Sequence, residues 1–492
     1  MRRFSLLVLF LFIGQISLAK FAFNDNCIKA YDDILSMRLN EGQALLEVEK
    51  KTNPSNAIPI FLENYIDFLK VLTTETREGF EELKQHKVER IELLQKEDKG
   101  SPYYLYCQAE INLQSCINRF KFQEFVSGAY ELQKAYKQLE ENQKKFPEFL
   151  PNQKSLGLLY ALIGMVPDNY KWALSTIGLK GNVQQGMVML EKLKDKLPNS
   201  SYAQFQNETI FFLSMVQMSV ENLDDIYGKV IKNTSTISNN NLMNVYIRSV
   251  AAIRTGHSDD AISYLNSRPK STGYAPFYYL DYLMGLAKLS RMDANANEPF
   301  DYYIKNYTGS FNVKDSYLKL AWFYLLNGDV NKYKAYIAAC KIRGQAISEK
   351  DKEALNQANN TFIPNAILLK ARLYFDGGYY DRALALLKDK KPENFNVYKE
   401  KLELTYRLGR VNDALGKFDQ AIQFYTSTIS SGIEYPYYFA ANSSLLLGYI
   451  FENRKQYDKA KYYYSLSMKM KNQEYKNSIE TKAKAGLKRL PN

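Results

Sequence analysis

A chain of 492 residues is too long for a single compact core, so it must form several domains or an elongated array. With 46% hydrophobic and 24% charged residues, the composition excludes a disordered chain. The 24 Gly and 14 Pro are few for an all-β protein of this length, which favours helices.

The first nineteen residues have the pattern of a secretory signal peptide. Arg2 and Arg3 form a basic start, Phe4–Ile13 is almost entirely apolar, and small residues precede a cleavage site between Ala19 and Lys20. The alternative is an uncleaved anchor, but a spanning helix needs ~20 apolar residues. We therefore expect an exported protein without a transmembrane span after cleavage. In a bacterium it would reside in the periplasm or at the outer envelope, and otherwise in the secretory pathway.

The four cysteines indicate neither a disulfide scaffold nor a metal site. Cys107 and Cys116 are nine residues apart on one predicted helix, which places them on opposite sides of it. Cys27 does not follow a lipobox, and His86 and His257 are far from any cysteine. We expect buried thiols, with no metal and no cofactor.

A frame of three residues recurs along the chain. Gly416 is suited to end a first helix, the small Ala421 follows five residues later, and the large Tyr425 four residues beyond that. The small residue allows two helices to pack closely, and the large one fills the next turn of the same face. The same frame recurs at Gly181, Gly186 and Leu190, at Gly256, Ala261 and Leu265, at Gly378, Ala383 and Leu387, at Lys455, Ala460 and Tyr464, and more loosely at Gly328 and Ile337.

This frame resembles the second half of a tetratricopeptide (TPR) helical hairpin. The small residues at 383, 421 and 460 are 38 and 39 residues apart, slightly more than the ~34 usual for this repeat. The resemblance is closest over residues 364–492 and looser over 150–345. It implies an all-α fold, a TPR-like helical-hairpin solenoid wound into a right-handed superhelix.

Two segments also resemble, more distantly, the eukaryotic TPR proteins associated with the mitochondrial outer membrane and with inclusion-body clearance. These segments are Leu156–Leu190 and Tyr317–Gly328. The signal peptide departs from that family, so the family's location and roles do not carry over. The Lys-, Asn- and Tyr-rich sequence is more similar to an exported TPR protein of the Bacteroidetes.

The frame divides the chain into four predicted parts. Residues 1–19 are the signal peptide, and residues 20–149 are amphipathic helices that could also be divergent hairpins. Residues 150–363 are degenerate TPR-like hairpins, and residues 364–492 are TPR repeats that end in a basic capping helix. Within 452–492, eleven Lys and Arg stand against four Asp and Glu, a net charge of +7. This excess either contacts an anionic surface or keeps the terminal helix soluble.

The sequence does not indicate an enzyme. It contains no GxxxxGK[ST] and no G-x-S-x-G motif, and its two histidines leave little material for acid–base catalysis at neutral pH. The export signal disfavours nucleic acid as a partner. We predict a non-catalytic protein–protein interaction scaffold or adaptor in the cell envelope or secretory compartment. The alternatives are a carbohydrate- or nutrient-binding helical protein of the outer envelope and an enzyme of unrecognised type.

The resemblance implies where a protein or peptide partner would bind, although not which partner. In a TPR array the first helices of successive hairpins line the concave face. Aromatic, Arg and amide groups there are favourable for partner binding, and the alternative is that they are ordinary exposed helix residues. They do not match the Lys and Asn pattern by which chaperone-binding TPR domains hold a C-terminal carboxylate. The predicted residues are Asn365, Arg372, Phe375, Tyr406, Arg410, Asp413, Asn442, Tyr449 and Glu452.

Overall fold

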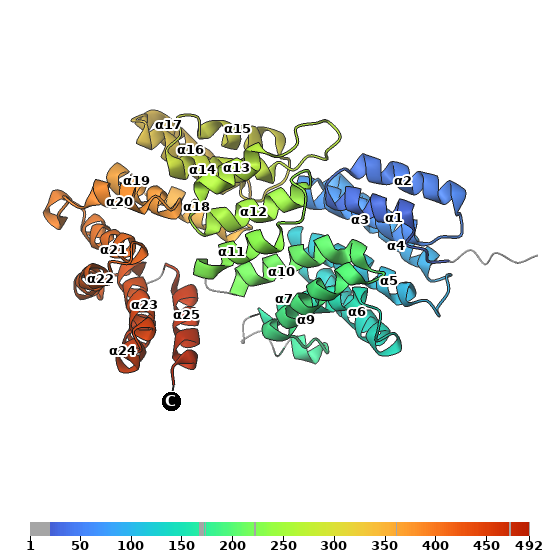
Figure 1. The fold of residues 1–492 in the computed structure, drawn as a ribbon. Helices are drawn as coiled ribbons and strands as arrows, with labels where there is room; N and C mark the ends of the chain where they lie inside the picture. Colours follow the sequence, from blue (N-terminus) through green and yellow to red (C-terminus); the bar gives the residue numbers. More distant parts are fainter. Residues whose placement is uncertain are drawn as a thin grey trace, which may run out of the picture. The chain divides into compact units, whose positions relative to one another are not determined.

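The computed structural model describes residues 20–166, 172, 174–220, 223–360, 362–471 and 474–491. The predicted signal peptide, residues 1–19, lies outside the described residues. Within them every regular element is a helix, which confirms the all-α prediction (Figure 1). The chain forms two compact units. The first comprises the chain up to Val220 together with Asn233–Asn244 and Pro269–Pro276, and the second comprises the remainder.

The first unit is built from helices that pair with their neighbours along the chain. α1 packs against α2, α3 against α4, α5 against α6 and α7 against α9, so the segment without a recognisable frame also contains hairpins. The helices are α1 (Asp25–Leu35), α2 (Leu39–Thr52), α3 (Ile58–Thr74), α4 (Arg77–Leu94), α5 (Pro102–Lys121), α6 (Phe125–Lys145), α7 (Pro151–Gly164), α9 (Val183–Lys196) and α10 (Gln206–Val220), with 3-10 turns at Leu197–Asn199 and Ala203–Phe205.

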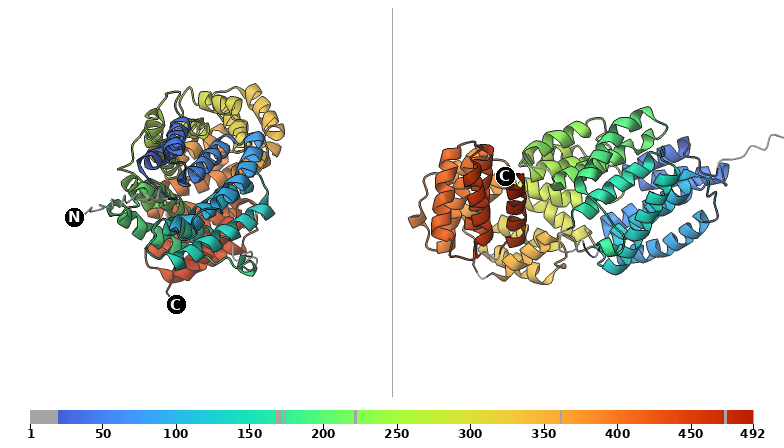
Figure 2. Two further views of the ribbon diagram at one scale, coloured as in Figure 1. Left: turned by 90° about the vertical axis from the view of Figure 1, so that its right-hand side faces the viewer. Right: turned by 90° about the horizontal axis from the view of Figure 1, so that it is seen from below.

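The second unit continues the same pairing. α14 packs against α15, α16 against α17, α19 against α20, α21 against α22 and α23 against α24, and α25 lies beside α23 and α24 (Figure 2). The helices are α11 (Leu223–Asn233), α12 (Leu242–Arg254, whose first residues belong to the first unit), α13 (Ser258–Asn266), α14 (Tyr279–Arg291), α15 (Asn297–Asn306), α16 (Val313–Leu326), α17 (Val330–Ile342), α18 (Glu349–Asn359), α19 (Ala366–Asp376), α20 (Tyr380–Leu387), α21 (Tyr398–Ala414), α22 (Phe418–Gly432), α23 (Tyr438–Asn453), α24 (Tyr457–Lys469) and α25 (Lys476–Arg489), with a 3-10 turn at Pro392–Asn394.

Local sequence signals explain where several helices begin. Asn24, Asp329 and Ser348 each accept a hydrogen bond from the backbone N–H three residues further on, which satisfies a donor that the helix leaves free. Pro102 and Pro151 lie in the first turns of α5 and α7, where the missing N–H costs nothing.

The repeat frame predicted from the sequence is confirmed in the hairpins of the second unit. Gly256, Gly328, Gly378 and Gly416 have positive φ at the turn between paired helices, and Lys455 takes the same conformation without being a glycine. The small and large residues of the frame are buried between the helices of each pair. They are Ala261, Leu265, Ala383, Leu387, Ala421, Tyr425, Ala460 and Tyr464. The fold is thus a TPR-like solenoid of helical hairpins.

In the first unit the frame has a different physical basis. Gly181 does not have a positive φ, so the prediction that it ends a first helix in the left-handed conformation is wrong. A Cβ at Gly181 would lie 2.6 Å from the carbonyl oxygen of Tyr160. A Cβ at Gly186 would lie 2.4 Å from the carbonyl oxygen of Gly157 and 2.7 Å from the amide nitrogen of Ala161. Both glycines permit a close approach of α9 and its preceding loop to α7.

In two hairpins a buried tyrosine joins the paired helices in the same way. A Cβ at Gly409 would lie 2.5 Å from the ring of Tyr425, so the glycine makes room for that ring. The hydroxyl of Tyr425 donates to Asp413 at 3.0 Å and ties the end of α21 to α22. The next hairpin repeats this arrangement with Gly448, Tyr464 and Glu452.

A buried lysine lies at the centre of a charge cluster in the first unit. Lys154 on α7 is fully buried, and its Nζ pairs with Glu110 on α5 at 3.0 Å and with Glu208 on α10. Tyr31 donates to Glu208, and Ser155 donates to Glu110. Burial raises the pKa of Glu208 to about 8 and lowers the pKa of Lys154. Charge-assisted hydrogen bonds thereby connect α1, α5, α7 and α10.

The prediction that the cysteine side chains are buried is confirmed for all four, and none of them forms a disulfide in the structure. Burial raises the pKa of Cys27 to about 12, so its thiol stays protonated at neutral pH. Among the helices that the structure describes, none is both long and apolar enough to cross a membrane.

Candidate functional site

A pocket of about 230 Å³ lies between the first helices of the last three hairpins and α25. We call it the four-helix pocket, because α19, α21, α23 and α25 each contribute side chains. Five of the nine predicted partner-binding residues meet there. The lining residues are Ala371, Arg372, Phe375, Asp376, Tyr406, Arg407, Arg410, Val411, Tyr438, Asn442, Tyr475, Ser478, Ile479 and Lys482.

Arg372 on α19 is held from several sides. Its guanidinium lies 5.1 Å from the ring centroid of Trp322, 3.5 Å from Glu353 and 3.7 Å from Asp376. Cation–π contact and two long ion pairs therefore fix its direction while leaving it half-buried. Tyr475 also donates to Glu353, which ties the start of α25 to α18.

Arg410 on α21 reaches across to the neighbouring hairpin. Its guanidinium lies 4.3 Å from the ring centroid of Phe375, and its Nη1 donates to the hydroxyl of Tyr406 at 3.0 Å. Within the part of the chain that the structure describes, Arg410 is in no ion pair. Its charge is therefore available to a ligand in the pocket.

Tyr406 lies deeper than the sequence frame implied. Only 2% of its surface is exposed, because its ring packs against Tyr438 and Phe439, and its hydroxyl is bonded to two other lining residues. That hydroxyl accepts hydrogen bonds from Arg410 and, at 2.7 Å, from Asn442 on α23. Tyr406 therefore links α21 to α23. Its ring belongs to the core, and its hydroxyl oxygen forms the hydrogen bonds.

The other four predicted residues lie outside the pocket, and three of them have structural partners in the repeat. Asn365 caps α19 by accepting from the backbone N–H groups of the next turn. Asp413 accepts from Tyr425, and Glu452 accepts from Tyr464 and pairs with Arg489 at 2.8 Å. The fourth, Tyr449, packs against the ring of Tyr464.

Several lining residues were missed by the sequence frame. Arg407 and Tyr438 stand at positions that the frame did not select. Ser478 and Lys482 come from α25, which was predicted only as a cap, and Tyr475 directly precedes that helix. One sequence signal did distinguish Asp413 and Glu452: in two successive hairpins an acidic residue stands twelve positions before the frame's tyrosine. This repeated spacing indicates that each acidic residue contacts the tyrosine within its hairpin.

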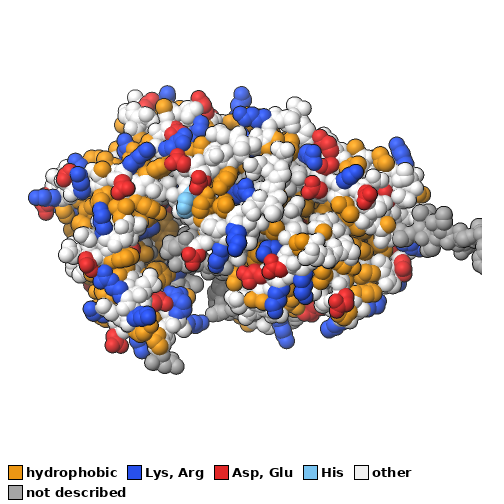
Figure 3. Space-filling view, in the orientation of Figure 1, with side chains coloured by type: hydrophobic (Ala, Val, Ile, Leu, Met, Phe, Trp, Pro, Cys, Tyr) orange, Lys and Arg blue, Asp and Glu red, His pale blue; other side chains and the backbone are white. Residues whose placement is uncertain are grey.

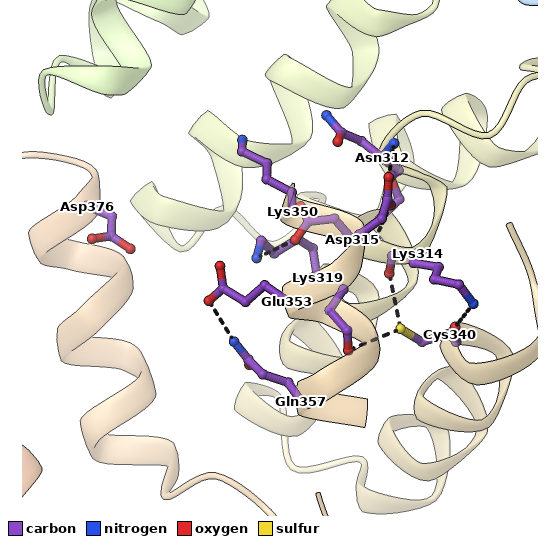
Figure 4. A network of polar contacts seen from close by, with 12 residues as sticks. Asn312, Lys314, Asp315, Lys319, Cys340, Lys350, Glu353, Gln357 and Asp376 are labelled. Carbon is purple, nitrogen blue, oxygen red and sulfur yellow. Dashed lines mark hydrogen bonds and ion pairs between the residues drawn. The ribbon is translucent and has the colours of Figure 1, made fainter. Parts of the chain in front are cut away.

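A second polar network joins α14, α16 and α18 (Figure 4). Asp315 accepts from Tyr282 at 2.7 Å and pairs with Lys319 at 3.0 Å, and Lys350 donates to the same tyrosine at 3.3 Å. Burial alone would raise the pKa of Asp315, but the two lysines more than offset it, and the pKa lies below its usual value. The charges of Asp315 and the two lysines compensate one another, so this network stabilises the packing of the helices. Glu353 lies at its edge.

The surface charge is mixed on the face that Figure 3 shows. Acidic and basic side chains are interspersed there, a pattern typical of a solvated surface. Among the described residues, no group of His, Cys, Asp and Glu could hold a metal ion.

A scan against protein-family models finds no match, and neither does a search of curated proteins. Among solved structures, the crystal structure of the APC/C hetero-tetramer Cut9–Hcn1 aligns with 94% of this chain and 95% of that chain. The two are 12% identical, with a TM-score of 0.29. A similarity at this level supports no inference, so the function rests on the geometry of the chain itself.

Proposed function

We propose that the chain is a non-catalytic scaffold that binds a protein partner through the four-helix pocket, in the cell envelope or secretory compartment. The observation that carries the proposal is the convergence of Arg372, Phe375, Tyr406, Arg410 and Asn442 on one pocket. They come from three successive hairpins, which is how repeat proteins build binding surfaces from equivalent helices.

The composition of the pocket supports a partner site. Arginine and aromatic side chains dominate the energetics of protein interfaces. Aromatic rings bury large areas while freezing few rotatable bonds, and arginine offers a planar charged group with several hydrogen-bond donors. Here Phe375, Tyr438 and Tyr475 provide rings, and Arg372 and Arg410 are already oriented by their contacts with rings. A partner would therefore find a preorganised surface, which lowers the entropic cost of binding.

Blocking the pocket with a bulky maleimide label tests this proposal. Ser478 is exposed at the pocket wall, and the four native cysteines are buried, so Ser478→Cys gives one reactive thiol. Gln423→Cys on the exposed side of α22 is the matched control. We expect the label at position 478 to abolish partner recovery from envelope extracts of the source cell, and the label at 423 to leave it unchanged. Unfolding temperatures should be equal. Full recovery with the label at 478 would exclude the pocket.

Export is the second part of the proposal. The mature protein is expected to begin at Lys20, because the signal-peptide pattern places the cleavage after Ala19. Intact mass and N-terminal sequencing of protein from the source cell measure this. Retention of Met1, or a lipid on Cys27, would contradict it. The buried position of Cys27 within α1 supports an unmodified thiol.

A further inference from the structure

We infer that the four-helix pocket binds an oxyanion, a carboxylate or a phosphate monoester, carried on an apolar stem of the partner. The inference rests on the proposed function, because it states which group of the partner the pocket accepts. It follows from three independent features of the lining: its charge, its hydrogen-bond donors and its rings.

The charge of the lining is positive. Arg372, Arg407, Arg410 and Lys482 face one carboxylate, that of Asp376. Arg407 forms an ion pair with Glu403, and Arg372 forms ion pairs with both Glu353 and Asp376. Over the described ranges, Arg410 and Lys482 are in no ion pair. Two cations that lack an ion-pair partner, one on α21 and one on α25, favour an anion in the pocket.

The lining is also rich in donors. The hydroxyl of Tyr406 accepts from Arg410 and Asn442, so its own proton remains for an acceptor in the pocket. The hydroxyl of Tyr438 has no hydrogen-bond partner among the described residues. Burial, followed by the neighbouring Tyr406, raises the pKa of Tyr438, so this phenol stays a donor at neutral pH. Several donors and few acceptors match a group that offers several lone pairs.

The rings define what must carry the anion. Phe375, Tyr438, Tyr475 and the side chain of Ile479 line the same pocket, and Tyr438 packs edge-on against Tyr475 with centroids 4.9 Å apart. These groups form apolar walls beside the cations. A volume of about 230 Å³ accommodates a small stem and its anionic head together. A bare ion would leave these walls without contact.

Binding of small probes to the full mature chain tests the inference. Phenyl phosphate and benzoate supply the two oxyanions on an apolar stem, inorganic phosphate lacks the stem, and benzamide lacks the charge. We expect phenyl phosphate or benzoate to bind by calorimetry more tightly than both inorganic phosphate and benzamide. The tighter of the two probes identifies the source of the oxyanion. Benzamide binding as tightly as benzoate would overturn the inference.

Two variants assign the binding to the pocket. Arg410→Gln and Lys482→Gln should each weaken the tighter probe by ~10-fold or more, because each removes a charge-assisted hydrogen bond. Arg382→Gln, an exposed arginine on α20 outside the pocket, should leave its affinity unchanged. Lys482 is exposed, so its variant tests the site even if Arg410→Gln alters folding. Unchanged affinity in the Lys482 variant would place the anion elsewhere.

The two proposals fail separately. If the probes bind as expected but the label at position 478 leaves partner recovery intact, the oxyanion site stands and the partner-binding function of the pocket fails. If that label abolishes recovery but none of the charged probes binds, the function stands and the oxyanion inference fails.

Discussion

Lys154→Met is expected to lower the free energy of unfolding by about 3–5 kcal/mol at neutral pH, the cost of breaking a buried ion pair by removing one partner. Glu110 and Glu208 are 2% and 3% exposed, so without Lys154 two buried carboxyl groups would share a dry site with no cation. Urea unfolding measures the change. Lys192→Met, which changes an exposed lysine on α9, is the control and should have little effect.

The deficit of the Lys154→Met variant should depend on pH. Burial raises the folded-state pKa of Glu208 to about 8, above its unfolded value, and the variant lacks the cation beside it, so the folded variant binds more protons than the unfolded chain. Its stability is therefore retained at low pH and lost as the pH rises through the folded pKa of Glu208. Adding Glu110→Gln and Glu208→Gln should recover most of the loss at pH 8. A deficit below about 1 kcal/mol for the single variant would show that the cluster is hydrated.

Gly186→Val is expected to destabilise the first unit by about 3 kcal/mol, the upper end for overpacking. The new Cβ would lie 2.4 Å from the carbonyl oxygen of Gly157 and 2.7 Å from the amide nitrogen of Ala161. Backbone atoms cannot rotate away as a side chain can, so α9 would have to move from α7. Thermal unfolding measures the effect.

Gly228→Val is the matched control for that variant. Gly228 is exposed on α11, and a Cβ there would meet nothing within 4 Å. The substitution should therefore preserve or slightly raise stability, since it removes a helical glycine. Equal melting temperatures for the two valine variants would contradict the close approach of α7 and α9.

The sequence predicted the hairpins well, because the frame is dictated by local physics. A glycine at Gly416 or Gly378 is favoured by a positive φ, and a small residue at Ala421 or Ala460 by the contact between two helices. Because these requirements recur in every hairpin, a single sequence is enough to show them as a repeated pattern. Gly181 shows the limit: its spacing matched, but close packing and not a left-handed turn requires the glycine there.

The candidate site was predictable only in part. The frame identifies which side of a first helix faces inward, which brought Arg372, Phe375 and Arg410 together. The frame does not indicate how deeply a side chain is buried. Tyr406 is therefore almost fully buried where an exposed side chain was expected. Nor does it specify tertiary partners that arrive from far along the chain, such as Lys482 on α25 or the ion pairs of Lys154.

Photo-cross-linking in the source cell tests the central claim most directly. A benzoyl-phenylalanine at position 478 lies at the wall of the four-helix pocket, and one at position 423 lies on the exposed side of α22. The account predicts a partner protein covalently joined at 478 and not at 423, with the cross-link lost when Arg410→Gln and Lys482→Gln are combined. A partner joined at 423 and absent from 478 would contradict it.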